Sequence, residues 1–282
     1  LVAYVDFARR TLLAASSPKP TSAAALALSS LSAEDAKAWM TAAEEAWNEA
    51  AALGEAIVAL TGSESSAWEP LALRADVLAA GALLLGALAP HAPGATLSLP
   101  SETERAAEPV ALASEAGPMV DATPVAGDAG GQQRVDEADA ASLAEAAFAM
   151  ALAKGGRKAA PAVGLAAGDM LLERARLLQG RGGHGSEDVA MGCLKRASEA
   201  FQGVAALRAD ADADPSDFKA TAWYNLACIA GLLSQPGHSA IALTKCLTQV
   251  PKASRPRWVS EAQEDMDLRS VISHPEVQAS LS

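Results

Sequence analysis

The sequence WYNLACIAGLLSQPGHSAIALTKCLTQVP, residues 223–251, decides the fold because its residue order is more informative than its composition. Two segments rich in alanine and leucine flank the tetrapeptide Ser-Gln-Pro-Gly at 234–237. That tetrapeptide favours a turn, since proline fixes φ and glycine tolerates backbone angles that other residues avoid. The stretch therefore predicts a helix, a tight turn and a second, antiparallel helix.

The composition favours helices along the whole chain. About a quarter of the 282 residues are alanine, and aromatic residues make up 4%. Alanine is the best helix former, whereas strands need branched and aromatic side chains to pack a pleated surface. Because half of the residues are apolar, the chain is able to bury a sizeable core. These values predict an all-α protein.

Charge and cysteine usage limit the partners and the compartment. The net charge of −12 argues against a nucleic-acid partner, because phosphate binding needs clustered Lys and Arg. Cys193, Cys228 and Cys246 are far apart, which favours buried thiols in a reducing compartment over disulfides or a zinc site. We therefore expect a soluble, intracellular protein, and a plastid or a mitochondrion would suit an assembly role. The chain opens at Leu1 without a methionine or a signal-peptide pattern, so we expect a processed or truncated start.

The least charged long stretch, residues 77–100, is a candidate for a membrane-spanning segment. Prolines interrupt it and leave residues 77–89 as its unbroken apolar run, which is too short to span a bilayer. We therefore expect no transmembrane segment. The leucines at 83–85 are expected to be buried against other helices, and contact with a membrane surface is the alternative.

Two helical regions flank an acidic segment rich in Pro, Gly and Ala. Residues 1–94 are predicted to form an N-terminal helical domain, in which 39–60 and 68–88 make an antiparallel hairpin. Residues 95–136 carry seven acidic side chains against two basic ones. Low hydrophobicity with excess negative charge does not offset the entropy of ordering, so this segment is predicted to be a mostly disordered linker. Residues 137–282 then form a C-terminal helical domain.

Glycines divide the start of the C-terminal region. The pattern predicts helices over 140–152, 162–179 and 187–208, with a break at the two glycines at 155 and 156. The glycine-rich loop at 180–185 has the spacing of a phosphate-binding loop. It lacks the lysine and hydroxyl that must follow, and no strand precedes it, so nucleotide binding is not expected.

Residues 219–252 resemble the tetratricopeptide repeat (TPR), a 34-residue helix-turn-helix unit. With Trp223 at the fourth position of the repeat, Leu226 falls at the seventh, Ala227 at the eighth and Pro251 at the thirty-second. The resemblance implies that the small eighth residue lets the two helices approach closely. Trp223 and Leu226 would then fill the gaps on either side.

Other positions of the repeat match less well. Leu243 stands where an aromatic residue is usual and Cys246 where alanine is usual, yet each keeps the required bulk or smallness. Residues 162–208 resemble a degenerate, longer repeat, and residues 1–94 match the pattern poorly. The resemblance nevertheless implies antiparallel helix hairpins stacked as a TPR-like α-solenoid.

The C-terminal tail resembles the segment that follows the terminal repeat of many TPR arrays. Residues 257–282 contain an aspartate-rich piece and a proline-containing end. A solenoid needs its final apolar face covered, so the resemblance implies that this tail caps the last helix. The residues expected to cover it are Leu268, Val271, Ile272, Val277 and Leu281.

The resemblance implies a protein-binding function. In such arrays the first helices of the repeats line a concave groove that holds a peptide or a partner helix. Asn225 matches the position at which peptide-binding members place an amide against the ligand backbone; a solvent-facing or turn-bonding asparagine is the alternative. Lys219 and Arg174 are the nearby cations that would add contacts. We therefore expect a TPR adaptor or assembly factor, and the alternative is a permanent structural subunit of a larger multiprotein complex, such as an organellar one.

The sequence contains no recognisable catalytic motif. Its four histidines are isolated from one another and from cysteines or carboxylates at metal-binding spacing. No Gly-x-Ser-x-Gly elbow occurs, and no Ser or Cys pairs with a base on sequence grounds. We therefore expect no enzyme, no cofactor, no metal and no small-molecule substrate.

Overall fold

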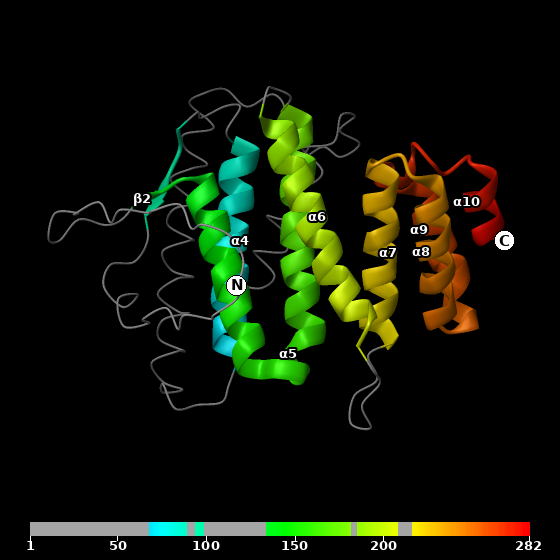
Figure 1. The fold of residues 1–282 in the computed structure, drawn as a ribbon, viewed down its shortest axis with the longest axis horizontal. Coiled ribbons are helices and arrows are strands. Elements are labelled where there is room, and N and C mark those ends of the chain that lie inside the picture. The colour runs from blue at the N-terminus through cyan, green and yellow to red at the C-terminus, as the bar shows by residue number, and fades with distance from the viewer. Residues whose placement is uncertain (1–67, 89–93, 99–133, 182–184, 208–215) are drawn as a thin grey trace, which may run out of the picture.

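The computed structural model describes residues 68–88, 94–98, 134–181, 185–207 and 216–282 (Figure 1). Within these ranges the protein is almost entirely helical, as the composition predicts. The helix predicted over 39–60, and with it the first predicted hairpin, lies outside the described residues.

The long helices precede a series of short elements. The long helices are α4 (Glu69–Leu88), α5 (Glu137–Arg181), α6 (Ser186–Ala205), α7 (Ser216–Leu232) and α8 (Pro236–Gln249). The C-terminal elements are the 3₁₀ helix η2 (Lys252–Ser254), α9 (Arg255–Glu264), the 3₁₀ helix η3 (Met266–Leu268) and α10 (Pro275–Ser280). Two short strands, β1 (Leu97–Ser98) and β2 (Arg134–Val135), lie between α4 and α5.

Helix α5 consists of two arms that meet at Gly156. This glycine has φ 52° and ψ −131°, backbone angles that side-chain-bearing residues rarely adopt. Figure 1 shows the chain reversing direction there through a short transverse piece of helix, so the arms lie antiparallel. The predicted break at the two glycines is confirmed.

The helices pack as adjacent pairs. Helix α4 packs on α5, α5 on α6, and α7 on α8 (Figure 1). Both arms of α5 touch α4: Gly155 lies against Trp68 at the start of α4, and Gly86 near its end lies against Leu177 of the second arm. Helix α7 also contacts both α5 and α6. The all-α arrangement in helix pairs is therefore confirmed.

The ends of the predicted linker are ordered parts of the core. Leu97 pairs with Val135 and Ser98 with Arg134 in an antiparallel ladder. Leu97 and Val135 are buried in the same hydrophobic cluster as the inner faces of α4, α5 and α6. The described part of the predicted N-terminal domain therefore shares one hydrophobic core with α5 and α6. The sequence did not show this because apolar residues are spread around all sides of α4, and such a helix needs partners on more than one face.

Helix α4 is the one described helix that is long and apolar enough to cross a membrane. The stretch Glu69–Ala87 has 19 residues, longer than the apolar run that the sequence suggested. Of its most apolar part, 56% is buried inside the protein. A buried core helix of a soluble protein can be equally long and apolar. The absence of a transmembrane segment stays a prediction.

The C-terminal tail covers the α7–α8 pair as predicted. Leu268, Val271 and Val277 are buried in one cluster with residues of α7 and α8, and Ile272 and Leu281 pack against it. Apolar residues spaced along the short C-terminal elements and the turns between them thus cover the α7–α8 pair.

Candidate functional site

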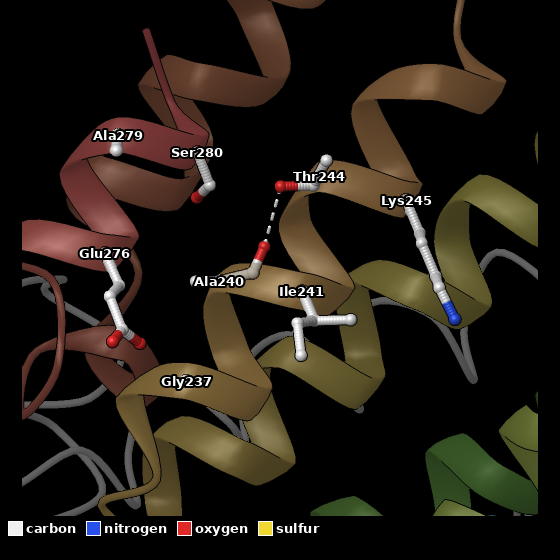
Figure 2. Close-up of a pocket in the computed structure, with 8 residues that line it drawn as sticks. All are labelled: Gly237, Ala240, Ile241, Thr244, Lys245, Glu276, Ala279 and Ser280. Atoms are coloured by element: carbon white, nitrogen blue, oxygen red, sulfur yellow. Dashed lines mark hydrogen bonds between the residues drawn. The ribbon is translucent and has the colours of Figure 1, made fainter.

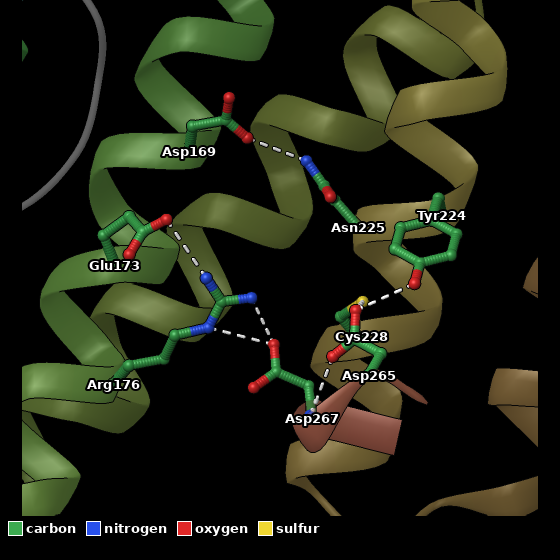
Figure 3. Close-up of polar contacts among 8 residues, drawn as sticks. All are labelled: Asp169, Glu173, Arg176, Tyr224, Asn225, Cys228, Asp265 and Asp267. Atoms are coloured by element: carbon green, nitrogen blue, oxygen red, sulfur yellow. Dashed lines mark hydrogen bonds and ion pairs between the residues drawn. The ribbon is translucent and has the colours of Figure 1, made fainter. Parts of the chain in front are cut away.

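The predicted anchor Asn225 lies at the contact between α7 and α5. Its side-chain Nδ2 donates a hydrogen bond to Oδ1 of Asp169 in the second arm of α5, at 2.8 Å (Figure 3). The side chain is half-buried. This amide therefore joins two helices of the chain and is oriented by them.

The two predicted cations have different surroundings. Arg174 is buried, and its Nε lies 3.2 Å from Oε1 of Glu137 at the start of α5. Arg181 binds the other oxygen of Glu137 at 2.7 Å, so the carboxylate links the two arms. This placement argues against Arg174 as a partner contact. Lys219 is half-exposed near the start of α7, and none of the ion pairs among the described residues involves it.

The predicted repeat-packing residues lie in and around the α7–α8 pair. Ala227, Leu243 and Cys246 are almost completely buried. Trp223 and Leu226 are half-buried, and Pro251 is exposed just after α8 ends. Nζ of Lys245 in α8 lies 4.1 Å from the centroid of the Trp223 ring, which adds a cation–π contact between the two helices.

A polar network that the sequence analysis missed joins α5, α7 and η3 (Figure 3). Arg176 donates from Nε to Oδ2 of Asp267 at 2.9 Å and from Nη1 to Oε1 of Glu173 at 3.1 Å. Tyr224 donates from its hydroxyl to Oδ2 of Asp265 at 2.8 Å. Oδ1 of Asp265 accepts from the backbone amide of Asp267, so Asp265 caps the start of η3.

Burial and the neighbouring carboxylates set the protonation states of this network. Burial lowers the pKa of Arg176, but Asp267 and Glu173 raise it to a greater extent, so the net pKa lies above the ordinary value. Burial and the adjacent Asp265 raise the pKa of Tyr224 and of Cys228 above their ordinary values. Tyr224 and Cys228 therefore stay protonated at neutral pH and act as donors to the carboxylate.

Three of these residues have the spacing of a metal-binding group. Ligand atoms of Cys228, Asp265 and Asp267 lie within 4.8 Å of one another. However, a cysteine binds metal as a thiolate, and the raised pKa of Cys228 disfavours that form. Arg176 already supplies the positive charge beside Asp267. The chemistry of this donor set fits a hydrogen-bonded network better than a metal centre.

The C-terminal segment covers one face of α7. Tyr224, Cys228 and Gly231 share this face, being spaced by four and three residues. The ring of Tyr224 meets Trp258 of α9 edge-on with centroids 5.5 Å apart, and Gly231 lies directly against the backbone carbonyl of Asp267. Part of the surface that the resemblance assigns to a partner is therefore occupied by the chain itself.

An open hollow lies on the other helix of the last pair, between α8 and α10 (Figure 2). Its volume is about 540 Å³. Small residues of both helices form it, and Ile241, which is 56% exposed, projects beside it. Lys245 and Glu276 also line it. The sequence does not predict this hollow or its charged residues, because α8 and α10 are separated in the sequence and come together only when the C-terminal tail folds back.

Comparison with protein-family models, with curated proteins and with solved structures finds no match to this chain.

Proposed function

We propose that the chain is a non-enzymatic protein-binding module, an adaptor or assembly factor built of TPR-like helix pairs stacked as a solenoid. The observation that carries this proposal is the position of α7, which packs on its own partner α8 and on both α5 and α6 of the preceding pair. Repeat arrays are built in this way, each pair contacting its neighbours and together presenting an extended surface.

Close packing within the last pair supports the same interpretation. Ala227 is fully buried between α7 and α8, where a TPR needs a small residue. The tail buries Leu268 and Val277 over this pair, as the end of an array requires.

The partner contact is placed at the exposed start of α7. Lys219, one of the two cations predicted to add contacts, is half-exposed there, and Phe218 beside it is 39% exposed. Binding hot spots are enriched in aromatic residues, and a neighbouring cation adds electrostatic complementarity. A partner segment with an apolar side chain next to a carboxylate would fit this end of the helix.

Crosslinking and affinity purification of the full chain test the proposal. Phe218→Asp and Lys219→Glu should each lower the yield of the bound protein, by about tenfold for the aromatic position. Met191→Asp is the matched control, because Met191 is an exposed apolar residue on α6, and it should retain the partner. A partner bound equally well by all three variants contradicts the proposed contact, and purification without any specific partner contradicts the function.

The alternative, a permanent structural subunit, draws support from other exposed apolar residues. Met150, Met191 and Ile241 are exposed on the first arm of α5, on α6 and on α8, the second helix of each pair. Exposed apolar residues of this kind suit a permanent interface. A stoichiometric complex that survives high salt and dilution supports the subunit, whereas an adaptor complex should dissociate.

A further inference from the structure

One face of α8 is centred on the exposed Ile241, with one residue a helical turn before it and another a turn after it. Gly237 and Lys245 each lie four residues from Ile241, about one helical turn away, so all three share one face. Figure 2 shows Ile241 between Gly237 and Lys245 along α8, with Glu276 of α10 on one side of Ile241 and the Lys245 side chain pointing away from α10 on the other. This face therefore has the apolar Ile241 at its centre, a glycine at one end and a lysine at the other.

Charges of opposite sign flank the isoleucine. Glu276 of α10 lies at the Gly237 end, where its Oε2 is 3.2 Å from the position that a Cβ of Gly237 would take. Lys245 lies at the other end. Both side chains are exposed, and neither forms an ion pair with any described residue. Each is therefore available to an opposite charge from outside.

We propose that this face binds a second copy of the chain about a two-fold axis that passes near Ile241. In a two-fold interface, each contact between two residues occurs twice with the roles exchanged. Two antiparallel α8 helices that cross at Ile241 bring Gly237 of one copy opposite Lys245 of the other. Lys245 then meets Glu276 of the second copy, and the reciprocal pair forms at the other end.

Small residues allow the close approach that this pairing needs. Gly237 and Ala240 of α8 and Ala279 of α10 leave the hollow of about 540 Å³ beside Ile241. Helix axes pack 8–10 Å apart only where the side chains at the contact permit it. Burial of the Ile241 side chain in the hollow of the second copy is the main favourable contribution.

The lysine is already held in place before association. Its ammonium lies over the Trp223 ring at 4.1 Å, which limits its rotamers and lowers the entropic cost of forming the new pair. The face is self-complementary because its opposite charges lie on opposite sides of Ile241. A second copy satisfies this pattern without any further partner, so the proposal is independent of the adaptor function.

Sedimentation equilibrium of the full chain over a range of concentrations tests the dimer. The wild-type chain should show a monomer–dimer equilibrium, and Ile241→Asp should abolish the dimer. Met191→Asp adds the same charge to an equally exposed apolar site on α6 and should leave the dimer intact. A wild-type chain that stays monomeric, or a dimer that tolerates Ile241→Asp, overturns the proposal.

Charge exchange tests the antiparallel register. Lys245→Glu and Glu276→Lys each place like charges opposite one another and should weaken self-association by about tenfold or more. An equimolar mixture of the two variants should restore association as a heterodimer, because the first variant presents only carboxylates and the second only ammonium groups. The double variant should also dimerise. Circular dichroism checks that each variant is folded, and failure of folded variants to recover on mixing contradicts the register.

Discussion

Arg176 in the second arm of α5 and Asp267 in η3 form an ion pair; their Nε and Oδ2 atoms are 2.9 Å apart, and the two residues are 91 positions apart in the sequence. The pair ties the C-terminal segment, which packs on α7, to the second arm of α5 (Figure 3). The segment that covers α7 is therefore stabilised by two kinds of contact, the burial of its apolar residues and the ion pair with Arg176.

Arg176→Met should lower the free energy of unfolding by about 2–4 kcal/mol, because it leaves the buried carboxylate of Asp267 without its cation. Urea denaturation measures this change. Arg257→Met is the control, because Arg257 is exposed where it pairs with Glu261, and it should change stability by less than about 1 kcal/mol. Equal effects of the two variants would show that the Arg176–Asp267 pair contributes no more to stability than the exposed Arg257–Glu261 pair.

Gly231→Ala should destabilise the protein by about 1–3 kcal/mol, because the added methyl group would collide with the backbone carbonyl of Asp267. Gly203→Ala in α6 is the matched change, since a Cβ there meets no atom within 4 Å. It should stabilise the helix by about 0.5–1 kcal/mol. Thermal unfolding of both variants gives the comparison, and the same sign for both would contradict the close contact at Gly231.

Gly156→Ala should destabilise the protein by about 1–3 kcal/mol through backbone strain alone. Its φ of 52° and ψ of −131° disfavour a side chain, although nothing lies within 4 Å of the added methyl group. Denaturation in urea measures the loss. A neutral result would mean that the two arms of α5 join with different backbone angles.

Asn225→Ala should cost about 1 kcal/mol, since it removes the hydrogen bond to Asp169. Asn225→Asp should cost more, because it places two carboxylates together. Chemical denaturation ranks the two variants. An amide that serves only a partner would leave the stability of the free protein unchanged in both.

Stability should fall as the pH rises above about 9. Burial raises the pKa of Cys246 from its ordinary value of 9.0 to about 12 and that of Cys228 in the same direction. Between these values the unfolded chain releases thiol protons that the folded chain retains, so unfolding is favoured by up to about 1.4 kcal/mol per pH unit for each thiol. Urea unfolding between about pH 9 and 11 measures the slope. Cys246→Ala should reduce it, and an unchanged slope would mean that this thiol titrates alike in both states.

Local patterns in the sequence were sufficient for the helical elements. The turn at 234–237 and the break at 155–156 follow from the backbone preferences of Pro and Gly, which act within a few residues. The cap residues Leu268, Val271 and Val277 could be identified because the tail resembles the segment that covers the final apolar face of a repeat array. The hollow between α8 and α10 had no such local signal.

By itself the sequence indicated that the described part of the chain is helical, and it predicted the approximate bounds of α4, of the two arms of α5 and of α6 and the turn between α7 and α8. The resemblance to the TPR added which tail residues cover the last pair. Only the tertiary structure decided that α4 shares one core with α5 and α6 across the acidic segment, and that Asn225 and Arg176 bind Asp169 and Asp267. The physical reason is that helix formation depends on neighbours within a few residues. Contacts between distant side chains depend instead on how apolar surfaces pack. Because the apolar residues of α4 are spread around the helix, its sequence does not indicate which side faces which partner.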